Sequence, residues 1–266
     1  ACLLIKCMPL FSRNLELTTV STKNILGMRF RDEELQYAAR SIVSNASDNI
    51  RRFVYFVNAH CVNVAAREVK YKQLLQNTPE LYADGIGMAI AARLWGLRLD
   101  HNVNGTDLFP LICEYAAKQG VPLAFFGSEP GVADACKEKM TSQYPGLRVV
   151  YTRNGFVTED EQDALLRSIN ESGAKILLVA RGVPLQELWI DRNKDRLDAP
   201  VLMGVGALFD FYSGKVQRAP SFLRKIGMEW LYRLYLEPTR LFRRYVIGNP
   251  EFLVRALILR IRGNTG

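Results

Sequence analysis

Apolar runs and amphipathic segments alternate along most of this 266-residue chain. Continuous apolar runs of the kind that form buried strands occur at residues 25–30, 53–57, 121–126, 147–151, 175–180 and 201–205. Segments with helical spacing lie between them, at residues 32–45, 62–75, 88–95, 108–118, 132–144, 159–172 and 186–193. Strands without polar alternation are buried on both faces, which is typical of parallel sheets. The pattern therefore predicts an α/β fold, with an open, Rossmann-like, mostly parallel sheet and helices on both faces.

Several apolar runs end in residues suited to a binding loop. These residues are Asn58, Asp84, Gly127, Gly182 and Gly206. In open α/β sheets, ligands bind beyond the carboxyl ends of the strands, so we expect these loops to meet in one crevice. The chain has neither a G-x-G-x-x-G nor a P-loop pattern, so no dinucleotide or ATP fingerprint is indicated.

Asp84 lies between a short apolar run and a glycine pair, just before the helical segment at 88–95. One explanation is local, because an Asp at this position can cap the free N–H groups of the first helical turn. The other is catalytic, because Gly85 and Gly87 allow close approach of a ligand and the loop follows a strand. We take Asp84 as the candidate catalytic base and keep the cap as the alternative.

The pattern changes near Ser221, where three helical segments follow one another at residues 222–236, 238–247 and 250–261. Large apolar side chains alternate with arginines along them. One interpretation is a set of ordinary helices packed on the domain with a solvated basic face. The other is an interfacial element that lies on an anionic membrane. We divide the chain into an α/β domain at residues 1–217 and a basic helical membrane-docking appendage at 218–266.

The positive charge of the chain is concentrated in this tail. The chain carries 35 Lys and Arg and 27 Asp and Glu, for a net charge of +8. Residues 215–266 hold 11 of the basic and 3 of the acidic residues, which leaves 24 of each in the first 214. Such asymmetry indicates an anionic partner for the tail: nucleic acid, a membrane surface or ligand phosphates.

Composition limits the other chemistries. Five cysteines without a CxxC pair indicate reduced thiols in a cytosolic protein, not a disulfide or zinc framework. The chain has only two histidines, His60 and His101, so we do not expect a His-based metal site or a Ser-His-Asp triad. No apolar run reaches the roughly 18 residues that span a bilayer. The apolar start at residues 1–10 lacks a basic leader, so we do not expect a signal peptide.

Six motifs follow one another between residues 83 and 234, inside a longer matching stretch of about residues 26–252. They are A-D-G-I-G at 83–87, N-G-T-D-L at 104–108, G-V-P-L-Q-E at 182–187, G-V-G through F-D at 204–210, G-K-V-Q-R-A-P at 214–220 and G-M-E-W-L-Y-R-L at 227–234. In this order they resemble the WecG/TagA/CpsF family of bacterial glycosyltransferases. Each motif alone is weakly specific, but the ordered set of six is highly specific.

The resemblance implies a peripheral (monotopic) enzyme on the cytoplasmic face of the bacterial inner membrane. It implies inverting transfer of a sugar, of glucose, ManNAc or ManNAcA type, from a UDP-sugar to an undecaprenyl-diphosphate-linked sugar. Such enzymes act in the synthesis of cell-surface polysaccharides, including exopolysaccharides, teichoic acids and common antigen. The chain has no D-x-D metal motif, so we expect no cofactor and assign the stabilisation of the diphosphate to arginines.

The resemblance also implies site residues. The Asp of the family's A/P-D-G motif, here Asp84, is the expected base. The expected substrate-binding residues, including tail arginines that close over the diphosphate, are Asn58, Asn104, Gln186, Gly206, Asp210, Arg233, Arg240 and Arg243. The chain departs from the family pattern at Asn102, where an Arg is common, and at Phe56, where a Thr is common. These departures favour an altered donor or acceptor, with a preference for xanthan-type β-1,4-glucosyl transfer from UDP-glucose.

Two other classes of protein remain as alternatives. A nucleic-acid-binding protein would use the basic tail, although the large apolar side chains between its arginines suit lipid better. A non-catalytic sugar-nucleotide-binding module would bind UDP without turnover.

Overall fold

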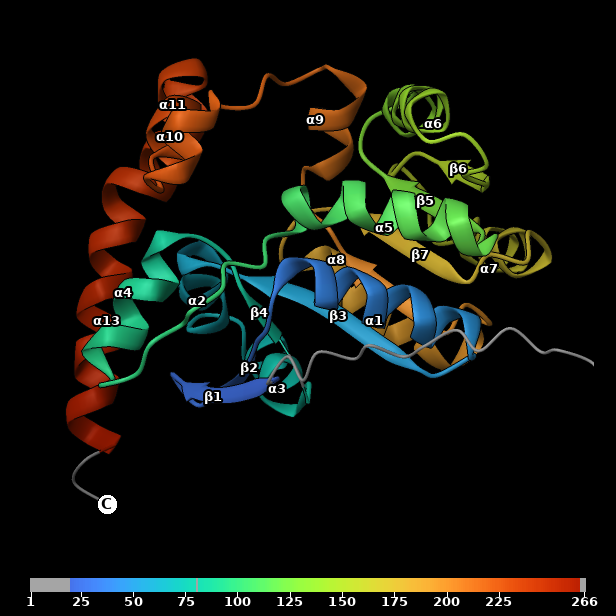
Figure 1. Ribbon diagram of the computed structural model, residues 1–266. Helices are drawn as coiled ribbons and strands as arrows, with labels where there is room; N and C mark the ends of the chain where they lie inside the picture. Colours follow the sequence, from blue (N-terminus) through green and yellow to red (C-terminus); the bar gives the residue numbers. More distant parts are fainter. Residues whose placement is uncertain (1–19, 80, 264–266) are drawn as a thin grey trace, which may run out of the picture.

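The computed structural model describes residues 20–79 and 81–263, which form an eight-stranded sheet with helices on both faces (Figure 1). The strands are β1 (Ser21–Ile25), β2 (Met28–Asp32), β3 (Arg52–Val57), β4 (Leu81–Ala83), β5 (Leu123–Gly127), β6 (Val149–Arg153), β7 (Ile176–Ala180) and β8 (Val201–Gly204). Their order in the sheet is β1-β2-β4-β3-β8-β7-β5-β6. Only β1 and β2 pair antiparallel, so the expectation of a mostly parallel α/β sheet is confirmed. The apolar start at residues 1–10 lies outside the described ranges.

Two layers of helices enclose the sheet. One layer consists of α1 (Leu35–Ser47), α5 (Gly105–Gln119), α6 (Val132–Gln143) and α9 (Leu208–Ser213). The other consists of α2 (Ala59–Ala65), α3 (Val69–Asn77), α4 (Ile86–Leu94), α7 (Gln162–Glu171) and α8 (Leu185–Asn193), which a short 3-10 turn follows at Lys194–Arg196. Successive strand residues point to opposite faces. Phe125 therefore packs against Phe109 and Phe209 in the first layer, and Phe126 against Trp189 in the second.

Three expected elements prove to be divided in the structure. The single strand expected at 25–30 is a hairpin, in which Leu26 and Gly27 adopt the positive φ angles of a two-residue turn, 57° and 74°. The helix expected at 62–75 is interrupted between α2 and α3. The helix expected at 222–236 is interrupted at Gly227, whose φ of 74° is incompatible with a continuous helix.

The tail forms a series of short helices and one long helix. These are α10 (Ser221–Lys225), α11 (Glu229–Leu236), α12 (Pro238–Phe242), a π-helical turn (Arg243–Ile247) and α13 (Gly248–Gly263). They form one side of the molecule, with α10 and α11 above α13 in the view of Figure 1. In the described ranges, no helix combines the length and apolarity that a membrane crossing requires.

One face of helix α13 is part of the hydrophobic core of the α/β domain. It packs against α2 and α4, where Phe252 and Ala256 are fully buried. The indole N–H of Trp95 donates to the Ala256 carbonyl at 3.2 Å, and the Asn63 amide donates to the Gly248 carbonyl at 2.7 Å. Burial of the two side chains and these bonds hold the end of the tail beside the loops that follow β3 and β4.

Candidate active site

A cavity of about 320 Å³ lies at the carboxyl ends of β3 and β4, between the sheet and the tail. The loops after these strands and the start of α5 form one wall, and residues from α10 to α13 form the other. Its polar and charged lining side chains are Asn58, His60, Asp84, Asn102, Asn104, Thr106, Arg224, Glu229, Arg233, Arg244, Tyr245 and Asn249.

Asp84 stands at the junction of β4 and α4. Its backbone N–H donates to the Val57 carbonyl at 2.9 Å, which continues the pairing with β3 by one residue. The N-cap of α4 is Gly85, with a φ of 85°, and no side chain caps this helix. The capping alternative for Asp84 is therefore wrong. The carboxylate faces the cavity and accepts a weak hydrogen bond from the Asn58 amide at 3.4 Å.

Burial raises the pKa of Asp84 above its ordinary value. The Asn58 hydrogen bond and the charges of Arg244 and Arg233 act in the opposite direction. A carboxylate with a raised pKa is a stronger proton acceptor than an exposed Asp, which suits a general base. His60 lines the same cavity, and burial together with Arg244 and Arg67 lowers its pKa to about 4. The imidazole is therefore uncharged near pH 7.

Two tail arginines face the cavity without an acidic partner. Arg233, on α11, lies over the ring of Phe211 at 5.2 Å, and Arg244, in the π-helical turn, lies over the ring of Tyr245 at 5.5 Å. Neither forms a salt bridge with any residue in the described part of the chain, and the buried Arg244 Nε has no hydrogen-bond partner there. An unpaired guanidinium carries planar donors that match phosphate. The cavity thus holds two anion-binding groups together with the Asp84 carboxylate.

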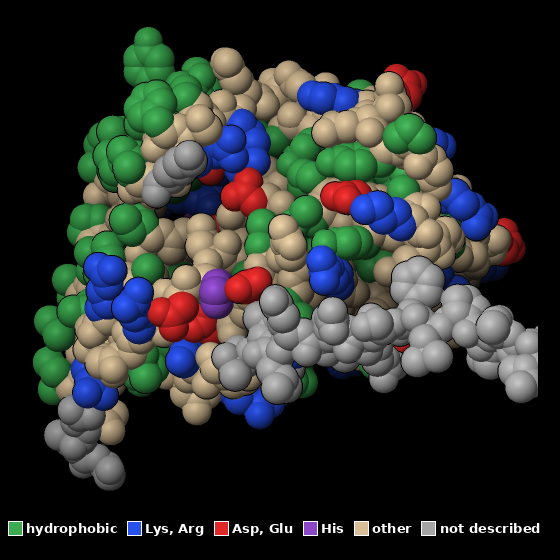
Figure 2. All heavy atoms as spheres, viewed as in Figure 1, with side chains coloured by type: hydrophobic (Ala, Val, Ile, Leu, Met, Phe, Trp, Pro, Cys, Tyr) green, Lys and Arg blue, Asp and Glu red, His purple; other side chains and the backbone are tan. Residues whose placement is uncertain are grey.

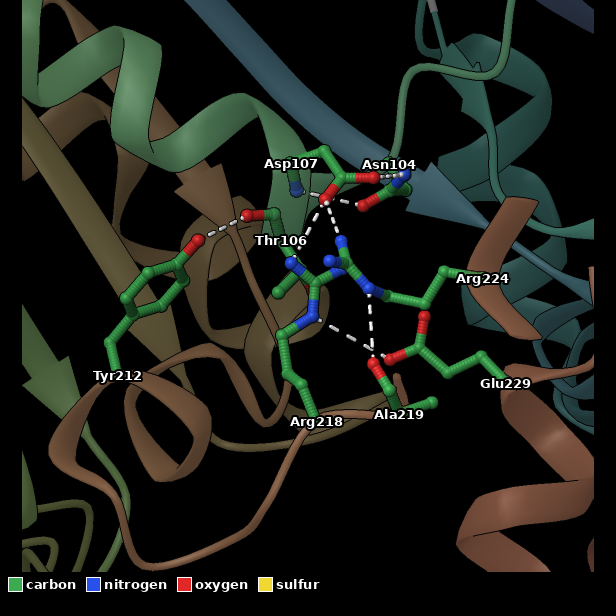
Figure 3. Close-up of polar contacts among 8 residues, drawn as sticks. All are labelled: Asn104, Thr106, Asp107, Tyr212, Arg218, Ala219, Arg224 and Glu229. Atoms are coloured by element: carbon green, nitrogen blue, oxygen red, sulfur yellow. Dashed lines mark hydrogen bonds and ion pairs between the residues drawn. The ribbon is translucent and has the colours of Figure 1, made fainter. Parts of the chain in front are cut away.

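A network of polar contacts fixes the tail against the start of α5 (Figure 3). Asp107 accepts from Arg218 at 2.9 Å and from Arg224 at 3.3 Å, and the Asn104 amide donates to it at 2.8 Å. Burial alone would raise the pKa of Asp107, but the Asn104 hydrogen bond and the two guanidinium charges hold it below its usual value. Arg218 also lies 3.7 Å from Glu229.

The turn between α10 and α11 also rests on the loop that carries Asp84. A Cβ built on Gly227 would lie 3.0 Å from the Ile86 side chain, so the two segments are in close contact. Ile86 is two residues after Asp84 and lines the same cavity. Through this contact and the Asp107 network, the tail is positioned against both sides of the site.

The structure brings some of the expected site residues together in this cavity. Asn58, Asp84, Asn104 and Arg233 all line it. Asn58 also caps α2, since its side-chain oxygen accepts from the N–H groups of His60 and Cys61. The Asn104 side chain likewise accepts from the Asp107 N–H and caps α5, as its position in a turn before a helix predicts.

The buried Gln186 and the half-buried Gly206 form a hydrogen-bonded pair outside the cavity lining. The Gln186 side-chain oxygen accepts from the Gly206 N–H at 2.9 Å, and its amide donates to the buried Glu187 carboxylate at 2.8 Å. A Cβ on Gly204 would lie 3.0 Å from this amide, so the space is filled. Gln186 thus fixes the loop after β8.

Asp210, Arg240 and Arg243 also lie outside the residues that line the cavity. Asp210 is 3.9 Å from Lys215, and the exposed Arg240 pairs with Glu237. Arg243 is exposed. In the π-helical turn it is Arg244, not Arg243, that reaches the cavity.

The two departures from the family pattern lie beside the site. Asn102 lines the cavity, and its side-chain oxygen accepts from the Gly85 N–H at 3.4 Å. The Phe56 ring stacks on Tyr82 and lies under the first turn of α5, where a Cβ on Gly105 would be 3.1 Å away. Both residues therefore shape the loops around Asp84.

Sequence reasoning missed several polar cavity residues, among them His60, Glu229 and Arg244. Glu229 stands in the G-M-E-W-L-Y-R-L motif, four residues before Arg233, and this spacing on one helix face was the available signal.

In the described ranges, no three His, Cys, Asp or Glu side chains cluster as a metal site would require. The described cysteines Cys61, Cys113 and Cys136 are buried free thiols.

The comparison with known proteins identifies the family. The family model described as "Glycosyl transferase WecG/TagA/CpsF family" matches residues 23–266. The match covers nearly the whole chain, so this protein belongs to the WecG/TagA/CpsF family of glycosyltransferases, as the six motifs indicate. Sugar donors and acceptors are accordingly its substrate classes.

Proposed function

We propose that this protein transfers a sugar, with inversion, from a UDP-sugar to an undecaprenyl-diphosphate-linked sugar in the synthesis of a bacterial cell-surface polysaccharide. Within that class we favour β-1,4 transfer of glucose in exopolysaccharide assembly. The observation that carries the proposal is that one cavity is lined by a half-buried carboxylate, Asp84, and by two arginines, Arg233 and Arg244, that form no salt bridge in the described part of the chain. This arrangement supplies a base for a hydroxyl and a binding site for a diphosphate.

The reaction needs one proton transfer and one displacement. Asp84 accepts the proton of the acceptor hydroxyl while its oxygen attacks the anomeric carbon of the donor. The bond from that carbon to the diphosphate oxygen breaks, and UDP leaves with the bonding electrons. Arg233 and Arg244 stabilise the charge that develops on the diphosphate, as bidentate donors in a partly dehydrated cavity. No metal ion takes part in this scheme.

Membrane attachment is the second part of the proposal. Large apolar side chains are exposed along the tail and on α4, and they gather at the edge formed by α10, α11 and α13 (Figure 2). They include Phe222, Ile226, Tyr235, Phe242, Ile247, Val254, Leu257 and Ile261, each at least 49% exposed. Apolar side chains beside arginines are typical of helices that lie in an anionic interface. Residues 218–266 would thus dock on the membrane through these exposed side chains and complete the site. The buried face of α13 would remain packed in the core.

Transfer of labelled sugar tests the proposal. Purified protein is incubated with radiolabelled UDP-glucose or UDP-N-acetylmannosamine and a bacterial membrane lipid extract, with and without EDTA. We expect label in the lipid fraction, unchanged by EDTA. Arg233→Ala and Arg244→Ala should each lower turnover by roughly a hundredfold, because each removes a charge-assisted contact to the leaving group.

The matched control is Arg260→Ala, which removes a tail arginine outside the cavity. It should leave turnover within about fivefold, since one arginine adds only about 1 kcal/mol to lipid attraction. Loss of transfer in EDTA, or equal defects in all three variants, would contradict the arginine scheme. UDP binding with no transfer to any lipid acceptor would favour the non-catalytic binding module.

A further inference from the structure

Glu229 is a second carboxylate in the cavity that the transfer scheme does not use. It lies in the first turn of α11, and its side chain is 31% exposed. Its nearest cationic atom is Arg218 Nε at 3.7 Å, beyond hydrogen-bonding distance (Figure 3). No side chain in the described ranges donates a hydrogen bond to it. A carboxylate can accept about four hydrogen bonds, so the Glu229 oxygens have capacity for a ligand.

The electrostatic surroundings of Glu229 favour uncharged donors. Burial raises the pKa of Glu229, the Arg218 charge opposes this, and the neighbouring Asp84 raises the pKa further. Asp107 holds the Arg218 guanidinium at the shorter distance of 2.9 Å. Phosphate oxygens would be repelled by Glu229 and attracted to Arg233 and Arg244. Hydroxyl groups would be accepted by it, because they bring donors without negative charge.

Helix α11 presents three different groups to the cavity from about one turn. Glu229 and Arg233 are four residues apart and therefore neighbours on one helix face, and Trp230 lies beside them in the lining. Trp230 makes an edge contact with Tyr245, at 6.0 Å between ring centroids. The side of the cavity formed by the tail thus combines an acceptor, aromatic surface and a cation.

We propose that Glu229 and Trp230 form the subsite for the hexopyranose ring of a sugar diphosphate. The inference rests on the proposed function and adds the residues that recognise the sugar. Trp230 packs against the C–H face of the ring, Glu229 accepts hydrogen bonds from its hydroxyls, and Arg233 contacts the attached phosphate. The order of these groups along α11 matches the order of ring and phosphate in such a ligand. A donor UDP-hexose and a lipid-linked acceptor share this chemistry.

Titration calorimetry on the full chain tests the subsite and distinguishes the two sources. The donor arm compares UDP with UDP-glucose and UDP-N-acetylmannosamine. The acceptor arm compares a short-chain alkyl diphosphate with the same compound bearing glucose or N-acetylglucosamine. The proteins are wild type, Glu229→Gln and Trp230→Leu, with Glu251→Ala as control. Glu251 is a tail carboxylate of similar exposure, 30%, that is paired with Arg67 outside the cavity.

In at least one arm, wild type and the control should bind the sugar-bearing ligand at least about tenfold more tightly than the bare diphosphate. Glu229→Gln and Trp230→Leu should each reduce that preference to less than about threefold. The Kd of each variant for the bare diphosphate should stay unchanged, and this binding also shows that the variant proteins are folded.

The subsite is refuted if neither arm shows a sugar preference in wild type, or if the preference survives in both variants. It is also refuted if Glu229→Gln weakens the bare diphosphate as much as the sugar ligand, because Glu229 would then only position the tail through Arg218. A sugar preference that is lost in the variants, without sugar transfer by wild type, would support the subsite while contradicting the proposed transferase reaction.

Discussion

Glu187 gives the sharpest prediction on stability. It is fully buried behind β8, where one carboxylate oxygen accepts from Gln186 at 2.8 Å and the other has no partner in the described part of the chain. Burial raises its pKa from 4.5 to about 7. Burial raises the pKa values of the neighbouring Tyr55, Cys61 and Tyr71, and the charged form of Glu187 raises them further. The folded protein therefore holds a proton on Glu187 over a pH range in which the unfolded chain has lost it.

The direction of the pH effect follows from this difference. Between pH 4.5 and about 7 the folded state binds more protons at Glu187 than the unfolded state, so this group destabilises the fold as pH rises through that window. At about 1.4 kcal/mol for each pH unit, the full effect is about 3 kcal/mol. Glu187→Gln removes the titration and keeps the shape of the side chain. The free energy of unfolding of the variant, relative to wild type, should rise by about 2–3 kcal/mol from pH 5 to pH 8.

Urea unfolding followed by circular dichroism, at pH values from 5 to 8, measures this difference. Glu114→Gln is the control, because Glu114 is 41% exposed on α5 and pairs with Lys118. The difference between this control and wild type should not change with pH. A difference between Glu187→Gln and wild type that is flat, or that grows as pH falls, would refute the reasoning.

Two further predictions concern packing and the membrane. A Cβ on Gly127 would lie 2.1 Å from the Ala180 carbonyl oxygen of the neighbouring strand. Gly127→Ala should therefore lower the free energy of unfolding by more than about 3 kcal/mol. Gly173 has open space around it, so Gly173→Ala should lower it by only about 1 kcal/mol. Thermal melting measures both, and equal shifts in Tm would contradict the packing argument. Phe222→Ser with Tyr235→Ser removes two tail side chains that are 63% and 81% exposed, and should lower flotation with anionic vesicles severalfold. The control Val69→Ser removes a 68% exposed side chain on α3 and should not lower vesicle flotation. An equal loss of flotation in the two variant proteins would mean that the tail does not direct docking.

The hydrophobic pattern predicts the fold well because most of its strands are buried on both faces. Continuous apolar runs such as 175–180 have few alternatives to a central parallel strand, and β7 is buried along its whole length. Backbone reversals were less predictable. The turn at Leu26 needs a positive φ angle from a leucine, which the pattern of apolar residues does not reveal.

The tail was the hardest part to derive from the sequence. Its many arginines indicated an exposed helix, although the four-residue spacing of Phe252 and Ala256 places one face of α13 in the core. The sequence predicted Arg243 as a site residue, whereas Arg244 lines the cavity. Both lie in a π-helical turn, which rotates side chains away from the positions that an α-helix would give them. Asp84 was easier to find, because a carboxylate between a strand and a glycine is a local feature.

The transfer assay with Asp84→Asn tests the central claim most directly. The variant keeps the size of the side chain and removes its ability to accept a proton, and Asp198→Asn on the surface serves as control. With the radiolabelled UDP-sugar that wild type uses, Asp84→Asn should lose about a hundred- to ten-thousandfold in turnover, with UDP affinity and thermal stability nearly unchanged. Turnover of the purified Asp84→Asn protein close to that of wild type would contradict the assignment of Asp84 as the base.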